Sequence, residues 1–454
     1  MASEHRISSD GIAEPIENED LAYISTSEQF PSDTSLKQLR RDQTDVFFSR
    51  SEENRYTPRS ILIDLEPSVI GKAMSAMPMF NSRNVHLSEN GAGAANNWQR
   101  GHAYASQHEE ELMNLIDREL DKCDNLSTFQ LFHSVAGGTG SGVGSYLLEL
   151  LDDRYGSKKL ITTYSIFPSN EKTSDVVVQP YNTVLTLRRL IDHSNATFVF
   201  DNDSLNRLES TLLNSSSSFA HGAFTGENKL ISYIACGVSN PLRFPSYTYS
   251  SYESILATLV PTPDLKFLSS AIAPYSNIPG CAPKGNYVSL NENDIVLELL
   301  NEKYKMNQVH ELPKYITMLD YIIGDRISQS ELRKGLIRAQ QRTTFVPWTS
   351  SVINVVNGKR PYGEPKRGLS GFQISNNTSI QHMFHKIVRQ YELLAKRAAY
   401  INFYTETNDP AERAQVLDTF NDCKELILSV IDEYRSCTSL SYLDDEQLDD
   451  QMIM

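Results

Sequence analysis

Short apolar runs alternate with amphipathic stretches in the first half of the chain. Four runs have the length and composition of buried strands: residues 60–64, 129–135, 160–167 and 196–200. Between them, apolar side chains recur every three or four residues, which predicts helices over residues 112–120, 143–151 and 184–191. Strands separated by helices indicate a parallel, doubly wound sheet, in which ligands bind at the carboxyl ends of the strands.

The second half of the chain has one uncertain region between clearer helices. A helical pattern over residues 228–238 leads into residues 241–245, whose two prolines predict the end of a connecting helix. The pattern of residues 244–370 mixes short strands, helices, prolines and glycines and leaves the sheet order open. Two long amphipathic helices follow, one over residues 380–398 and one starting at Asp409, which can cap its first turn.

The composition of the chain excludes several classes of protein. The 454 residues suffice for two or three domains, and the net charge of −15 argues against a protein that coats nucleic acid. Acidic residues gather in residues 1–45 and in the last sixteen residues, which we interpret as solvated segments. The five cysteines form no CxxC pair, and no apolar run is long enough to span a membrane, so we expect a soluble intracellular protein without disulfides or a zinc site.

The sharpest motif is the glycine-rich run of residues 136–142, directly after a predicted strand and before a predicted helix. Glycines let the backbone approach a ligand closely, so that successive N–H groups and the helix N-terminus can surround a phosphate. The run lacks the GK[ST] of a P-loop and is not a GxGxxG fingerprint. The alternative interpretation is a glycine-rich turn without a ligand.

The extended motif His133-Ser-Val-Ala-Gly-Gly-Thr-Gly-Ser-Gly-Val-Gly144 resembles the signature of the tubulin superfamily of GTPases, and Ala136 resembles the γ-tubulin variant of it. The chain matches the family, in order, from about Tyr56 to the second C-terminal helix, and looks most like the γ-tubulins of budding yeasts. Further matching segments are residues 64–67, 93–98, 175–182, 201–202, 205–207 and 261–268.

The resemblance implies an α/β fold: a Rossmann-like parallel-sheet GTPase domain, a connecting helix, a second α/β domain and a C-terminal helical hairpin. The expected boundaries are 1–55 for a truncated first helix and acidic insertion, 56–223 for the GTP-binding domain, 224–243 for the connecting helix, 244–370 for the intermediate domain, 371–438 for the C-terminal helices and 439–454 for the acidic tail.

The resemblance also implies a GTP/GDP site with Mg²⁺. The residues expected at the phosphates are Ala136, Gly137, Gly138, Thr139, Gly140, Ser141, Gly142, Asn96 and Asn97. Those expected at the ribose and base are Asp175, Asn202, Phe224 and Asn228, and those expected at the metal are Asp64 and Glu66. Without the resemblance, each asparagine reads as an ordinary turn residue, Phe224 as a core residue, and the two acids as exposed groups before a turn.

By the same resemblance, the function is microtubule nucleation at the spindle pole body or another microtubule-organising centre of the cytoplasm and cytoskeleton. The expected partners are γ-tubulin complex proteins below, α/β-tubulin above and lateral γ-tubulin neighbours in a ring, with no nucleic acid and no membrane. Ser251 occupies the position of the family's hydrolytic acid, and a serine cannot serve as a carboxylate base. We expect at most a weak GTPase, with Glu253 as the alternative acid.

One departure from the family leaves a second function open. The family's opening strand and GQCGNQ-like loop are not found in this sequence, which suggests an upstream coding segment and leaves a gap in the expected sheet. A nucleotide-free structural subunit, or a nonfunctional fragment, is therefore the alternative. A nicotinamide-dependent enzyme is disfavoured because no acid–base set accompanies the glycine loop, and Ala136 and Gln179 argue against α- or β-tubulin.

Overall fold

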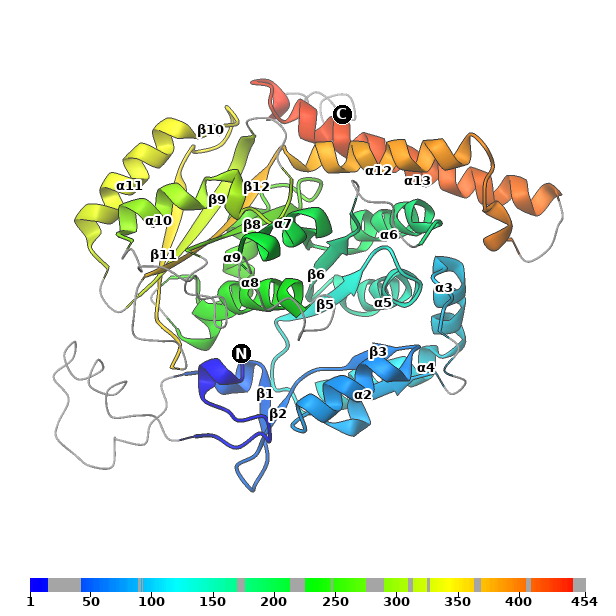
Figure 1. The fold of residues 1–454 in the computed structure, drawn as a ribbon, viewed down its shortest axis with the longest axis horizontal. Helices are drawn as coiled ribbons and strands as arrows, with labels where there is room; N and C mark the ends of the chain where they lie inside the picture. The colour runs from blue at the N-terminus through cyan, green and yellow to red at the C-terminus, as the bar shows by residue number, and fades with distance from the viewer. Residues whose placement is uncertain are drawn as a thin grey trace, which may run out of the picture.

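One eight-stranded sheet runs through both halves of the chain (Figure 1). The computed structural model describes residues 1–14, 42–88, 91, 93–169, 176–212, 225–245, 248–274, 290–308, 313–324, 327–362, 369–405 and 410–443. The strands of this sheet are β5 (Thr128–Ser134), β6 (Leu160–Phe167), β7 (Ala196–Asp201), β8 (Phe267–Ala273), β9 (Lys314–Ile323), β10 (Thr344–Phe345), β11 (Ile353–Gly358) and β12 (Ser370–Asn377). Their order is β10-β9-β12-β8-β7-β6-β5, and β11 also pairs with β9.

The first half of the sheet is parallel, as the sequence predicts. β5, β6, β7 and β8 pair in parallel, and Ser134 at the end of β5 is level with Ile166 of β6. The second half is mixed, because β12 lies antiparallel between β8 and β9. The glycine-rich run after β5 and Asn202 after β7 therefore leave the sheet at the same edge.

Helices cover both faces of the sheet. They are α2 (Pro67–Ala76), α3 (Trp98–Gln107), α4 (Glu109–Leu120), α5 (Gly144–Leu151), α6 (Gln179–His193), α7 (Asn202–Leu212), α8 (Thr225–Arg243), α9 (Tyr252–Leu259), α10 (Glu292–Leu299), α11 (Gln329–Arg342), α12 (Ile380–Ala395) and α13 (Pro410–Ser436). The helices expected from periodicity are confirmed, and α12 and α13 pack on α6 (Figure 1). Asp409, the expected cap of α13, lies outside the described residues. Within the described ranges, no helix combines the length and apolarity needed to cross a membrane.

The strand predicted at residues 60–64 does not join the large sheet. It forms β3 (Leu62–Asp64), which pairs in parallel with β4 (Val85–Leu87) in a separate two-stranded sheet. Among the described strands, β5 pairs only with β6, and Phe132 of β5 is 48% exposed. This separation agrees with the gap expected in the sheet, because the described residues provide no strand to bridge β3 and β5.

Residues before Tyr56 also form regular structure. A short turn at Ser3–His5 contacts α8 through an ion pair between Glu4 and Arg243, and a hairpin follows from β1 (Phe48–Arg50) and β2 (Tyr56–Pro58). His5 is fully buried, and its Nδ1 lies 2.5 Å from an Asp42 carboxylate oxygen. Of the expected acidic insertion, residues 15–41 lie outside the described part of the chain.

The connecting helix α8 passes through Pro241 and ends at Arg243, between the two prolines expected to stop it. Pro241 lacks the N–H that would bond within the helix. The buried Arg243 guanidinium ties the last turns of the helix together, because it donates to the Cys236 carbonyl at 2.7 Å and to the Ser239 hydroxyl at 3.0 Å.

A buried carboxyl lies in the second half of the sheet. Asp320 of β9 faces Gln373 of β12, whose Nε2 donates to Asp320 Oδ1 at 2.8 Å. Asp320 Oδ2 and Gln373 Oε1 are buried without a partner among the described residues. Burial raises the pKa of Asp320 to about 7. A protonated Asp320 can donate from Oδ2 to Gln373 Oε1, and this second hydrogen bond satisfies both atoms.

We expect Asp320→Asn to abolish a pH dependence of stability. The raised pKa means that the folded chain binds more protons than the unfolded chain between about pH 4 and 7, so wild-type stability falls as pH rises through this window. Asparagine mimics the protonated acid, so the variant should match wild type at or below about pH 4 and exceed it at pH 8 in urea unfolding. Asp418→Asn, on the exposed face of α13, is the control. Equal destabilisation of Asp320→Asn at both pH values would contradict the pairing.

Candidate nucleotide site

The glycine-rich run forms the N-terminal end of a long helical segment. A π-helical turn at Thr139–Val143 continues directly into α5. Among the described residues, the backbone N–H groups of Gly137 and Gly138 have no acceptor, although the Ser141 hydroxyl donates to the Gly137 carbonyl. Free N–H groups before a helix N-terminus attract anions. The run therefore has the geometry of a phosphate cradle.

Close packing against α3 explains why particular glycines are needed. A Cβ on Gly138 would lie 2.6 Å from Ala94 Cβ and 2.8 Å from the Asn97 nitrogen, and one on Gly142 would collide with the Trp98 carbonyl. A Cβ on Gly137 would meet nothing within 4 Å. Gly138 and Gly142 thus fit the run against α3, whereas Gly137 faces open space.

Asn182 of α6 joins the segments of the site, and its role was missed at the sequence level. Its side chain is fully buried and makes four hydrogen bonds. Nδ2 donates to the carbonyls of Asn96 and Ala136 at 2.8 Å each, and Oδ1 accepts from the Trp98 N–H at 2.9 Å and the Tyr404 hydroxyl at 2.7 Å. Asn182 is the last residue of the matched segment 175–182, and that match was the signal in the sequence that could have identified it.

His133 is a second missed residue. Its Nδ1 lies 2.9 Å from the Gly140 carbonyl, and its Nε2 lies 2.8 Å from Ser165 Oγ. Burial lowers the pKa of His133 to about 4, so the ring is neutral near pH 7. It anchors the glycine-rich run to β6 without adding charge.

The segment of residues 93–97 connects the expected metal ligands to the glycine-rich run. Gly93 approaches the Glu66 carboxylate, and Ala94 contacts Gly138. Asp64 ends β3 and accepts the Glu66 N–H at 3.2 Å. The structure therefore brings both acids to the same loop as the expected phosphate residues.

Asn96 and Asn97 differ in whether their side chains are available to a ligand. Asn97 is buried, its Oδ1 accepts from the Arg100 N–H at 3.1 Å, and its Nδ2 donates to the Phe403 carbonyl at 2.7 Å. Its side chain is thus engaged in capping α3. Asn96 has φ 55°, and it is exposed. Asn96 is the one available to a ligand.

The expected base-binding residues lie on neighbouring helices. Asn202 begins α7 and Asn228 lies in the first turns of α8, and these helices pack together. Asn228 is exposed, and Asn202 is half-buried. Asp175 and Phe224 lie outside the described residues.

Ser251 has a structural role that the sequence did not reveal. It is the N-cap of α9, and its hydroxyl accepts the Ser254 N–H at 3.2 Å. Glu253, the alternative acid, accepts a hydrogen bond from the Ser127 hydroxyl at 2.7 Å, which lowers the pKa of Glu253. Ser251 has no carboxylate, and the carboxylate of Glu253 lies two residues further along the chain.

The packing contrast predicts that Gly138→Ala destabilises the fold and Gly137→Ala does not. The added methyl of Gly138→Ala would overlap Ala94, at a cost of about 1–3 kcal/mol. The open surroundings of Gly137 predict a change within about 1 kcal/mol. Urea unfolding of the two variants measures the difference, and equal stabilities would show that the loop does not pack as described.

Comparisons with known proteins agree with this geometry. The family model "Tubulin/FtsZ family, GTPase domain" matches residues 9–210, and the model "Tubulin C-terminal domain" matches residues 263–389. A protein named tubulin gamma chain from Candida albicans is 54% identical over 458 residues, which cover 98% of this chain and 89% of the relative. Tubulin gamma chains from Eremothecium gossypii and Saccharomyces cerevisiae are 41% and 36% identical, covering 91% and 99% of this chain and 86% and 91% of those relatives. The chain therefore belongs to the tubulin family and, within it, to the gamma-tubulins.

Proposed function

We propose that the protein binds GTP at the glycine-rich run and nucleates microtubules by templating the addition of αβ-tubulin. The observation that carries the proposal is the pair of free N–H groups at Gly137 and Gly138, placed before a helix N-terminus. Nucleotide binding follows from the tubulin GTPase domain. In this proposal, GTP acts mainly as a ligand that sets the state of an assembly interface.

Asp64 and Glu66 would hold Mg²⁺ through water. Two carboxylates beside the phosphate loop suit an ion that prefers oxygen ligands and keeps much of its hydration shell. The ion would supply positive charge opposite the phosphates. Asn202 and Asn228 would bind guanine, Phe224 would stack on it, and Asp175 would contact the ribose.

Hydrolysis by the free protein should be weak. Ser251 caps α9 and supplies no carboxylate, so this face of the chain would not activate the nucleotide of another subunit. Hydrolysis at the chain's own site would depend on an acid from α-tubulin above.

The proposed partners follow from membership of the family, which supports tubulin-family interactions and a cytoskeletal protein. We propose γ-tubulin complex proteins below, αβ-tubulin above and lateral γ-tubulin neighbours in a ring. The proposed location is the spindle pole body.

A nucleotide-free structural subunit is the second candidate. The open edge of β5, with Phe132 48% exposed beside the glycine-rich run, favours it. In that case the chain would support assembly without binding GTP.

Gly137→Asp should separate the two candidates, because a side chain at Gly137 meets no protein atom within 4 Å and the change therefore adds charge without a packing clash. The new carboxylate would repel the negatively charged phosphates, which should lower GTP affinity by about tenfold or more. Gly71→Asp, on the exposed surface of α2, is the control and should leave affinity unchanged. Equilibrium titration with labelled GTP, followed by nucleation assays with complex proteins, provides the readouts. Nucleation by a chain that binds no GTP would favour the structural subunit.

A further inference from the structure

The turn between α12 and α13, residues 396–405, is tied directly to the nucleotide loops. Three hydrogen bonds make the connection: Asn97 Nδ2 to the Phe403 carbonyl at 2.7 Å, the Tyr404 hydroxyl to Asn182 Oδ1 at 2.7 Å, and the Tyr181 hydroxyl to the Ala399 carbonyl at 2.9 Å. Segments more than 200 residues apart in sequence therefore share one hydrogen-bond network.

Asn182 is the point at which the network is most sensitive. Its amide has two donors and two principal acceptor sites, and all four are used. Asn182 Oδ1 accepts hydrogen bonds from both the Tyr404 hydroxyl and the Trp98 N–H. If either nucleotide loop moves and rotates the Asn182 amide, the hydrogen bond between Asn182 and Tyr404 therefore changes as well.

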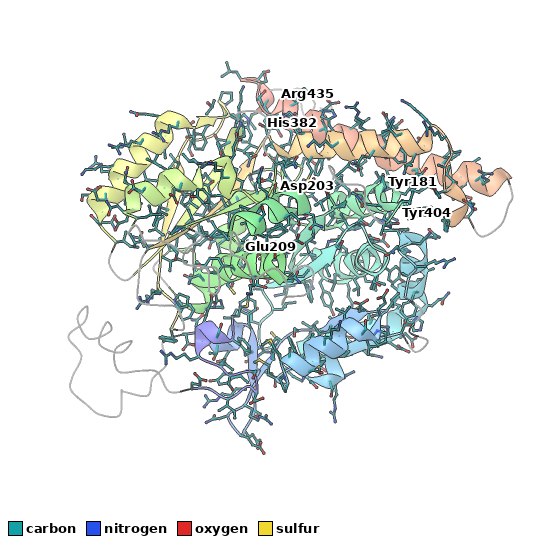
Figure 2. The ribbon with its side chains drawn as sticks, viewed as in Figure 1. Tyr181, Asp203, Glu209, His382, Tyr404 and Arg435 are labelled. Atoms are coloured by element: carbon teal, nitrogen blue, oxygen red, sulfur yellow. The ribbon has the colours of Figure 1, made fainter. Side chains whose placement is uncertain are left out.

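Packing fixes the Tyr404 hydroxyl as a donor. The ring is buried and packs edge-on against Tyr181, with centroids 5.5 Å apart, and against Phe420 at 5.4 Å. Figure 2 labels Tyr181 and Tyr404 near each other. Burial raises the pKa of Tyr404, which keeps its proton in place. Tyr404 thus donates to the same Asn182 oxygen that accepts the Trp98 N–H.

Both linked segments contain non-glycine residues in left-handed conformations. Ala398 and Tyr400 have φ of 45° and 60° in the turn, and Ala95 and Asn96 have φ of 47° and 55° in the ligand loop. Such conformations cost free energy and persist where surrounding contacts hold them. The turn also presents exposed aromatic side chains, with Tyr400 44% and Phe403 51% exposed.

We propose that Tyr404, acting through Asn182, is a positioning residue that couples nucleotide occupancy to the conformation of the 396–405 turn. The proposal rests on the GTP site described above. Ordering the ligand loops fixes the Asn182 amide, which tightens its bond with Tyr404 and orders the turn. Coupling is reciprocal, so loosening the turn weakens nucleotide binding by the same factor.

Tyr404→Phe tests the coupling because it removes only the hydroxyl. Tyr391→Phe is the matched control: Tyr391 lies in the same aromatic cluster, but its hydroxyl faces Asn421 at 3.4 Å. We expect Tyr404→Phe to weaken GTP binding about three- to tenfold, the effect of one buried hydrogen bond, and Tyr391→Phe to leave it unchanged. GTP should slow hydrogen exchange over residues 396–405 in wild type and Tyr391→Phe, but not in Tyr404→Phe.

Tyr181→Phe, which removes the bond to the Ala399 carbonyl, is a second variant expected to act in the same direction if Tyr404→Phe unfolds. The coupling is overturned if wild type binds GTP without slower exchange in the turn, or if Tyr404→Phe and Tyr391→Phe have equal affinity. A wild-type chain that binds no GTP would overturn the GTP site and the coupling together, whereas normal binding with an unresponsive turn would overturn the coupling alone.

Discussion

A single buried amide, that of Asn182, fixes the relative positions of the segments around the candidate site. It holds the start of the glycine-rich run through the Ala136 carbonyl and the neighbouring loop through Asn96 and Trp98. A side chain with both donors and both acceptors used leaves no freedom for one segment to shift alone. The candidate phosphate cradle at Gly137 and Gly138 therefore depends on a buried residue of α6.

Packing supports the same arrangement. Gly138 and Gly142 allow the run to touch α3 without a Cβ, and the neutral ring of His133 anchors Gly140 to β6. Asn97 caps α3 and reaches the Phe403 carbonyl. The site is thus assembled between the sheet, α3 and the C-terminal helices, although its ligand-facing atoms belong to short loops.

The sequence predicts much of this arrangement and misses specific parts for physical reasons. Local periodicity is sufficient for α4, α5, α6 and the parallel strands β5 to β7. The order of β8, β9 and β12 depends on long-range pairing, which local patterns do not record. The role of Asn182 depends on four partners from distant segments. Motif matching named both asparagines as candidates, and the structure distinguishes Asn96, which is exposed, from Asn97, whose side chain is engaged in hydrogen bonds.

The account places the phosphates of GTP on the backbone amides of Gly137 and Gly138, and these amides can be observed directly. The chain has 22 glycines, so ¹⁵N-glycine labelling with assignment by substitution gives a tractable NMR spectrum. We expect GTP, and not ATP, to shift the Gly137 and Gly138 amide resonances saturably as their protons gain acceptors. Binding of GTP that leaves both resonances unmoved would contradict the assignment of the phosphate site.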